Sequence, residues 1–142
     1  MKLAIASDHA GLELRAAIID YLTRAGHELT DLGPDSTDSV DYPDFAHRVT
    51  DALLAGTVDR GILVCGTGQG MAMTANKVEG VRAAVVADPF SARMAMCHND
   101  ARVLCLGARV VGRSVALECV DAWANAEFEG GRHQRRVSKM TR

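Results

Sequence analysis

The stretch GILVCGTGQG, residues 61–70, joins a short apolar run to a turn that contains three glycines. A continuous apolar run bounded by a turn signal is typical of a strand buried on both faces of a parallel sheet. The apolar residues that follow, up to about Lys77, predict a helix. Residues 61–77 therefore have the pattern of one strand–turn–helix unit of an α/β protein.

Similar units lie on both sides of this stretch. In addition to 61–65, we predict strands at residues 2–7, 28–32, 82–87 and 103–106. We predict further helices at residues 12–25, 44–55, 89–97 and 114–126. Strands that alternate with helices indicate a parallel sheet covered on both faces. We therefore expect one domain over residues 1–142, a three-layer α/β/α fold with a five-stranded parallel Rossmann-like sheet and a basic C-terminal tail.

The composition is that of an ordinary globular protein with one domain. The chain has 142 residues, of which 48% are hydrophobic, so it can build a core without disulfides or bound metal. The four cysteines show neither C-x-x-C spacing nor the spacing of a zinc site, and we read no secretory signal. We therefore expect reduced thiols in a cytoplasmic protein. Charged residues interrupt every apolar run short of the roughly 20 residues of a membrane span, so we expect no membrane partner.

The charge is unevenly placed along the chain. The net charge is −2, and since residues 132–142 contribute +5, the other residues carry −7. An acidic body with six aromatic residues does not suit nucleic acid, which we exclude as a partner. The basic end suits one small anion better, and a solvated tail is the alternative. Arg132 and Arg136 are four residues apart, on one face if helical, and Arg109 is a third candidate for a phosphate.

Open parallel sheets bind ligands outside the carboxyl ends of their strands. The glycines at 66, 68 and 70 let a backbone approach a ligand and turn its N–H groups toward negative charge, which predicts a phosphate or oxyanion site. A merely tight turn is the alternative, and the spacing is neither that of a dinucleotide fold nor that of a Walker A loop. Asp8 and His9 follow the first strand and are expected at the same edge.

Cys65 stands at the end of its strand, beside a helix N-terminus that favours the thiolate. It could be a base or nucleophile, or else a small buried hydrophobe. His98 ends a helix that returns to the amino edge of the sheet, so we expect it on the side away from Cys65. If both serve one reaction, the site is shared between subunits of a symmetric dimer. A partner for the helix dipole is the alternative for His98.

Seven motifs of the chain resemble those of ribose-5-phosphate isomerase B and of the related galactose-6-phosphate isomerase subunits. They are Ser7–Gly11, Asp41–Pro43, Gly61–Gly70, Ala75–Lys77, His98–Asp100, Gly107–Gly112 and Glu129–Val137. They run in order along nearly the whole chain, which makes their combination specific. The resemblance implies an isomerase of aldose and ketose phosphates that needs no cofactor and no metal.

The resemblance also implies roles for individual residues. Cys65 is the base that moves a proton between C1 and C2, and His98 opens the sugar ring. Thr67 and the backbone donors of Gly66, Gly68 and Gly70 stabilise the enediolate. Sugar hydroxyls are bound by Asp8 and Asn99, and Tyr42 and Gln69 belong to the pocket. The phosphate is bound by His9, Arg109, Arg132 and Arg136.

Isomerases of this type differ from one another in the catalytic base and in the sugar phosphate that they convert. Some use a glutamate at the position of Met71, but methionine cannot accept a proton, which leaves Cys65. The expected substrate pair is ribose 5-phosphate and ribulose 5-phosphate, acted on by a homodimer or by a tetramer made of two such dimers. Allose 6-phosphate, galactose 6-phosphate and a four-carbon sugar phosphate are alternatives, and a non-catalytic phosphosugar-binding regulator is the alternative of another class.

Overall fold

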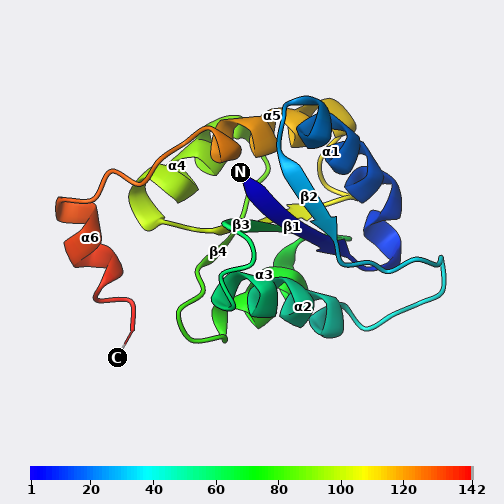
Figure 1. Ribbon diagram of the computed structural model, residues 1–142, viewed down its shortest axis with the longest axis horizontal. Coiled ribbons are helices and arrows are strands. Elements are labelled where there is room, and N and C mark those ends of the chain that lie inside the picture. Colours follow the sequence, from blue (N-terminus) through cyan, green and yellow to red (C-terminus); the bar gives the residue numbers. More distant parts are fainter. Residues whose placement is uncertain (142) are drawn as a thin grey trace.

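The computed structural model describes residues 1–141 and shows three layers around one sheet (Figure 1). The strands are β1 (Lys2–Ser7), β2 (Glu28–Asp31), β3 (Arg60–Cys65), β4 (Ala83–Val85) and β5 (Val103–Gly107). The helices are α1 (Leu12–Arg24), α2 (Tyr42–Leu54), α3 (Gln69–Asn76), α4 (Pro89–Asn99), α5 (Arg113–Ala124) and α6 (Arg132–Val137), with a 3-10 turn η1 (His9–Gly11). All strand pairs are parallel, in the order β2-β1-β3-β5-β4. The predicted fold class is confirmed.

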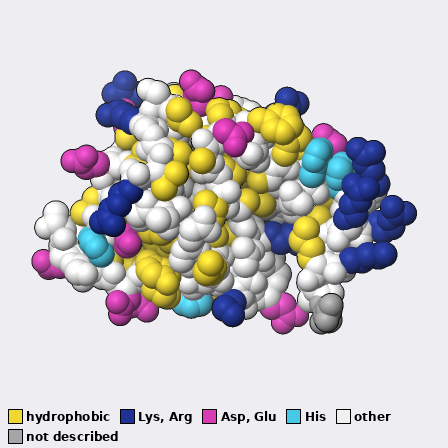
Figure 2. Space-filling model, turned by 180° about the vertical axis from the view of Figure 1, so that it is seen from behind, with side chains coloured by type: hydrophobic (Ala, Val, Ile, Leu, Met, Phe, Trp, Pro, Cys, Tyr) yellow, Lys and Arg dark blue, Asp and Glu magenta, His cyan; other side chains and the backbone are white. Residues whose placement is uncertain are grey.

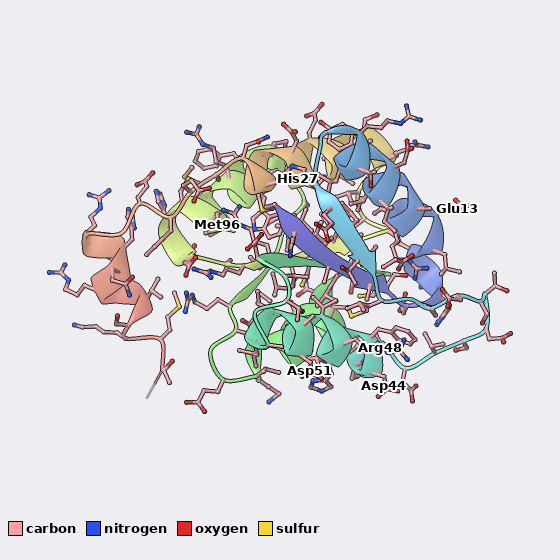
Figure 3. The ribbon with its side chains drawn as sticks, viewed as in Figure 1. Glu13, His27, Asp44, Arg48, Asp51 and Met96 are labelled. Atoms are coloured by element: carbon pink, nitrogen blue, oxygen red, sulfur yellow. The ribbon has the colours of Figure 1, made fainter. Side chains whose placement is uncertain are left out.

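The central strands are apolar because both of their faces are covered. Every residue of β3 and β5 is buried. One core packs α1, α4 and α5 on the sheet and contains the fully buried Trp123, and a second core packs α2 and α3 on the other face. Met96 of α4 lies between its helix and the sheet, whereas Glu13 of α1 and Asp51 of α2 lie on outer faces (Figure 3).

The chain path separates the loops that follow β1 and β3. From β1 the chain runs through α1 to the outer strand β2, and it then crosses by way of α2 to β3, on the other side of β1. The two strands are neighbours, but the helices that follow them cover opposite faces. Such a reversal opens a crevice at the carboxyl ends of the strands, where ligands bind in folds of this kind.

Several helix and strand ends differ from the predicted ones. α2 begins at Tyr42 instead of residue 44, because Pro43 occupies the first turn, where its missing N–H costs nothing. α4 continues beyond Cys97 to Asn99 and ends where Asp100 adopts a left-handed conformation. β4 covers three residues of the predicted six, and α5 ends at Ala124 instead of residue 126.

The C-terminal tail leaves the body after α5. Arg60 holds its starting point, since its buried guanidinium donates hydrogen bonds to the carbonyls of Trp123 and Ala126, both at 2.8 Å. The chain then reaches α6, which packs on the end of α4 and projects from the body (Figure 1). The tail is helical over Arg132–Val137 as predicted, and Arg142 lies outside the described residues. Within residues 1–141, no helix has the length and apolar character needed to cross a membrane.

Candidate active site

Cys65 ends β3 and points into the core between the sheet and helices α2 and α3, with 4% of its surface exposed. Its sulfur accepts a hydrogen bond from the backbone N–H of Gly68 at 3.1 Å, at the N-terminus of α3. Gly68 has φ +81°, a conformation that glycine adopts without strain. The sulfur therefore faces the backbone donors at the start of α3.

The other cysteines lack such a setting, and the four remain unpaired. Burial raises the pKa of Cys105 far above its usual range. It also raises the pKa of Cys119, to about 11. Both groups therefore stay protonated at neutral pH, and Cys65 is the cysteine whose sulfur faces a helix N-terminus.

The loop after β5 holds the glycine loop in place. The N–H groups of Ala108 and Arg109 donate to the carbonyls of Cys65 and Gly66, at 2.8 and 3.0 Å. A Cβ atom on Gly107 would lie 2.7 Å from the backbone of Thr67, so the two loops are in direct contact. The guanidinium of Arg109 lies over Gly66. Thr67 and Arg109 therefore both stand at the glycine loop.

Tyr42 closes the other side of the glycine loop. Its ring occupies the place where a side chain on Gly70 would lie, 2.5 Å from an ideal Cβ. Gln69 is exposed beside it, and its N–H donates to the hydroxyl of Thr67 at 3.3 Å. The glycine at position 70 thus serves close packing against Tyr42.

Asp8 and His9 lie at the same edge of the sheet. The N–H of Asp8 donates to the carbonyl of Val64 at 3.0 Å, which places Asp8 next to the strand of Cys65. The Asp8 carboxylate accepts the N–H of Ala10 at 2.9 Å and so caps η1. His9 is exposed and lines a cavity of about 630 Å³. Because neither Cys65 nor Thr67 lines this cavity, it opens beside the glycine loop and not over the sulfur.

His98 and Asn99 lie at the opposite edge, in the last turn of α4. Arg82, which precedes β4, donates to the Asn99 carbonyl at 2.8 Å. The His98 ring stacks on the ring of His133 from α6, with centroids 4.2 Å apart and planes 7° apart. Burial, and then positive charge at His98 and Arg132, lower the pKa of His133 from its ordinary value of 6.5.

Basic side chains surround this histidine pair. Figure 2 shows Lys, Arg and His side chains gathered at the end of the molecule that α6 forms. Arg132 and Arg136 are exposed there. One chain therefore brings nine of the predicted side-chain and loop positions to the edge of the sheet that carries Cys65, and it leaves His98, Asn99, Arg132 and Arg136 at the far edge. Sequence reasoning gave no role to Glu129 and His133, whose four-residue spacing was the available signal.

Glu129, His98 and His133 could also be considered as metal ligands, because their donor atoms lie within 4.8 Å of one another. An ion bound by two imidazoles must lie close to the plane of each ring. The two planes are nearly parallel and stacked, so they do not meet at a common point near the donor atoms. The arrangement therefore suits contact between the rings better than shared coordination.

Comparisons with known proteins match almost the entire chain. The family model described as Ribose/Galactose Isomerase matches residues 3–140. Ribose-5-phosphate isomerase B of Escherichia coli is 46% identical over 140 residues, covering 99% of this chain and 94% of that protein. The D-erythrulose-4-phosphate isomerase of Pectobacterium atrosepticum is 45% identical over 141 residues, covering 99% and 93%.

Solved structures agree with this match. A ribose-5-phosphate isomerase B from Clostridium thermocellum is 51% identical with a TM-score of 0.97, covering 99% of this chain and 95% of that one. The enzyme from Mycoplasma genitalium, solved with bound ribulose-5-phosphate, is 47% identical with a TM-score of 0.94, covering 98% and 93%. Since the match spans the sheet, the glycine loop and the tail, the chain belongs to the ribose/galactose isomerase family and is a sugar-phosphate isomerase.

Proposed function

We propose that the protein interconverts ribose 5-phosphate and ribulose 5-phosphate through an enediolate, with Cys65 as the base and without a cofactor. The observation that carries the proposal is the Cys65 sulfur, which is buried and accepts the Gly68 N–H at 3.1 Å. Met71, the position at which some relatives of this type have a glutamate, is fully buried in the core and has no proton to exchange.

The glycine loop supplies what the proton transfer needs. In the proposed reaction the Cys65 thiolate takes the proton from C2, and negative charge develops on O1. The proton returns to C1, while the proton of the O2 hydroxyl moves to O1. General base catalysis contributes about 10²–10⁴-fold, and one donor to a developing oxyanion about 10²–10³-fold. Thr67 and the N–H groups of Gly66 and Gly70 are the donors in this proposal, because the Gly68 N–H already donates to the Cys65 sulfur.

Binding of the rest of the substrate divides between the two edges. Asp8 and Asn99 contact sugar hydroxyls in the proposed complex, with Tyr42 and Gln69 beside the carbon chain. His9, Arg109, Arg132 and Arg136 bind the phosphate. Guanidinium groups suit this task because each donates two hydrogen bonds to phosphate oxygens. Holding the phosphate fixes the reacting carbons against the base, which lowers the entropic part of the barrier.

We infer that the active unit is a homodimer with shared sites. His98 and the two tail arginines lie at the edge opposite Cys65, so they serve the reaction in the site of a second subunit. Exposed apolar side chains support an interface, since Phe90 is 73% and Val110 61% exposed. Pairing of such dimers into tetramers remains compatible with the same site.

A four-carbon sugar phosphate is the second candidate substrate. The relative named for D-erythrulose 4-phosphate is as similar to this chain as the one from Escherichia coli, at 45% and 46% identity. A non-catalytic regulator is disfavoured, because binding alone needs no base. The six-carbon sugar phosphates allose 6-phosphate and galactose 6-phosphate have a longer carbon chain than ribose 5-phosphate. Their turnover therefore tests the size of the pocket.

The decisive assay is ketose formation from ribose 5-phosphate by the purified protein. Erythrose 4-phosphate and the two six-carbon phosphates are measured in parallel, with Cys65→Ala as the control variant. We expect turnover of ribose 5-phosphate, and a loss of about 10³-fold or more in Cys65→Ala while phosphosugar binding is retained. Near-normal kcat in this variant would exclude Cys65 as the base, and turnover of another sugar alone would replace the substrate.

A further inference from the structure

Two groups of the same chain, the ring of His133 and the carboxylate of Glu129, lie directly beside the ring of His98. A single oxygen of Glu129, Oε2, lies 3.5 Å from Nε2 of His133 and 3.8 Å from Nε2 of His98. The backbone N–H of Glu129 donates to the carbonyl of Cys97 at 2.9 Å, directly before His98 in the chain. The carboxylate is therefore fixed to the end of α4 and faces the same edge of both stacked rings.

His133 supplies a neutral, flat surface for the His98 ring. It is 6% exposed, and its Nε2 has no hydrogen-bond partner among residues 1–141. Burial and the neighbouring positive charges lower its pKa, which favours the neutral form of His133 at neutral pH. A buried ring in contact at 4.2 Å restricts how far the His98 ring can turn.

We infer that Glu129 is a positioning residue for the ring-opening step, holding the Nε2 side of His98 and leaving Nδ1 as the nitrogen that exchanges a proton with the sugar. The inference rests on the proposed function. A carboxylate beside one ring nitrogen of a histidine favours the tautomer and the ring orientation in which that nitrogen carries its hydrogen. In ring opening the C1–O4 bond breaks, His98 takes the proton of the anomeric hydroxyl at O1, and it returns a proton to O4.

Two rates measured on the same enzyme separate this step from the proton transfer at carbon. Ribose 5-phosphate is a closed ring that must be opened. Ribulose 5-phosphate cannot close a five-membered ring, because its O5 carries the phosphate. Exchange of its C1 hydrogen with deuterium in D2O therefore needs Cys65 and the glycine loop but no ring chemistry. The wild-type protein should show both ribose 5-phosphate turnover and this exchange, and absence of both would refute the proposed function itself.

Glu129→Gln is the test variant. We expect kcat for ribose 5-phosphate to fall about 10- to 100-fold, with the C1 exchange of ribulose 5-phosphate unchanged. The matched control is Glu127→Gln, because that carboxylate lies two residues away and faces Arg60 at 3.4 Å instead of the histidine pair. The control should leave both rates unchanged. Glu129→Asp, which restores a carboxylate, should regain part of the ribose 5-phosphate turnover.

Three results would overturn the inference. An equal fall of both rates in Glu129→Gln would make Glu129 an anchor of the tail and its phosphate-binding arginines. Two unchanged rates would remove it from the reaction. A loss of wild-type ribose 5-phosphate turnover on EDTA treatment that added Zn²⁺ restores, and that Glu129→Gln abolishes, would make the cluster a metal site.

Discussion

The two edges of the sheet hold their functional groups by different means. At the carboxyl edge, backbone hydrogen bonds from the loops after β1 and β5 hold the loop that carries Cys65 and Thr67. At the amino edge the neighbours of His98 are side chains, since its ring stacks on that of His133 and lies 3.8 Å from a carboxylate oxygen of Glu129. The proposed proton transfer at carbon is thus built into the sheet. The proposed ring opening by His98 and the phosphate contacts of Arg132 and Arg136 depend instead on α4 and the tail, which in the proposed dimer reach the site of another subunit.

The difference has an energetic basis. Every residue of β3 and β5 is buried, so moving the carboxyl edge requires opening the core. The six-residue helix α6 buries His133 and Val137 and exposes its other residues. A short helix with few buried side chains opens at lower free energy than a core strand. In the proposed dimer, the tail is therefore the part of the site that contact with a second subunit would stabilise most.

Mixing two inactive variants tests the division between the edges most strongly. Cys65→Ala and His98→Asn should each lose nearly all ribose 5-phosphate turnover. In a mixed dimer one site carries both substitutions and the other carries neither, so a randomly exchanged mixture should regain about a quarter of wild-type activity. Turnover is measured before and after subunit exchange, which mass spectrometry follows. Exchanged dimers that remain inactive would place both groups in one subunit's site.

Removing one tail arginine should weaken substrate binding without touching the base. A hydrogen bond to a charged group contributes about 1.5–3 kcal/mol, so Arg136→Ala should raise KM about 10- to 100-fold with kcat nearly unchanged. Arg135→Ala is the matched control, because it removes the neighbouring exposed guanidinium, to which no role is assigned. A KM unchanged in Arg136→Ala, or raised equally in both, would remove Arg136 from the phosphate site.

A single methyl group should disturb the carboxyl edge. In Gly107→Ala the new Cβ would meet the Thr67 backbone at 2.7 Å, so the glycine loop must shift. We expect a loss of about 1–3 kcal/mol in the free energy of unfolding and a lower kcat. Gly112→Ala is the control, because nothing lies within 4 Å of a Cβ there. Denaturant unfolding and enzyme kinetics are measured on both variants. Equal free energies of unfolding of the two variants would show that the loops are not in rigid contact.

The carboxyl edge could be predicted from the sequence far better than the amino edge. The local pattern of residues 61–70 predicts a strand, a turn and the start of a helix. The positions of Cys65 and the glycines could therefore be predicted from the continuous apolar run and the turn that ends it. The stacking of His98 on His133 could not be predicted, because it depends on where the chain returns after α5. That return is set by Arg60, a buried charge within β3 that binds carbonyls more than 60 residues away. Periodicity carries no signal for such a contact.

Acidification should loosen the tail before the sheet. The pKa of His133 is lowered in the folded protein by burial and then by charge at His98, Arg132 and Arg136, against the raising effect of Glu129. A histidine whose pKa in the folded protein lies below its ordinary value of 6.5 makes its full contribution to the free energy of unfolding above pH 6.5. This contribution is lost as the pH falls from 6.5 through the lowered pKa. Amide hydrogen exchange at pH 7.5 and 5.5, corrected for intrinsic rates, should show lower protection of α6 at the acidic pH and unchanged protection of β3 and β5.

The control variant His133→Asn has no imidazole to protonate and should show the same α6 protection at both pH values. If wild-type α6 also kept its protection at pH 5.5, burial of His133 would not govern docking of the tail, and the two edges would respond to acid alike.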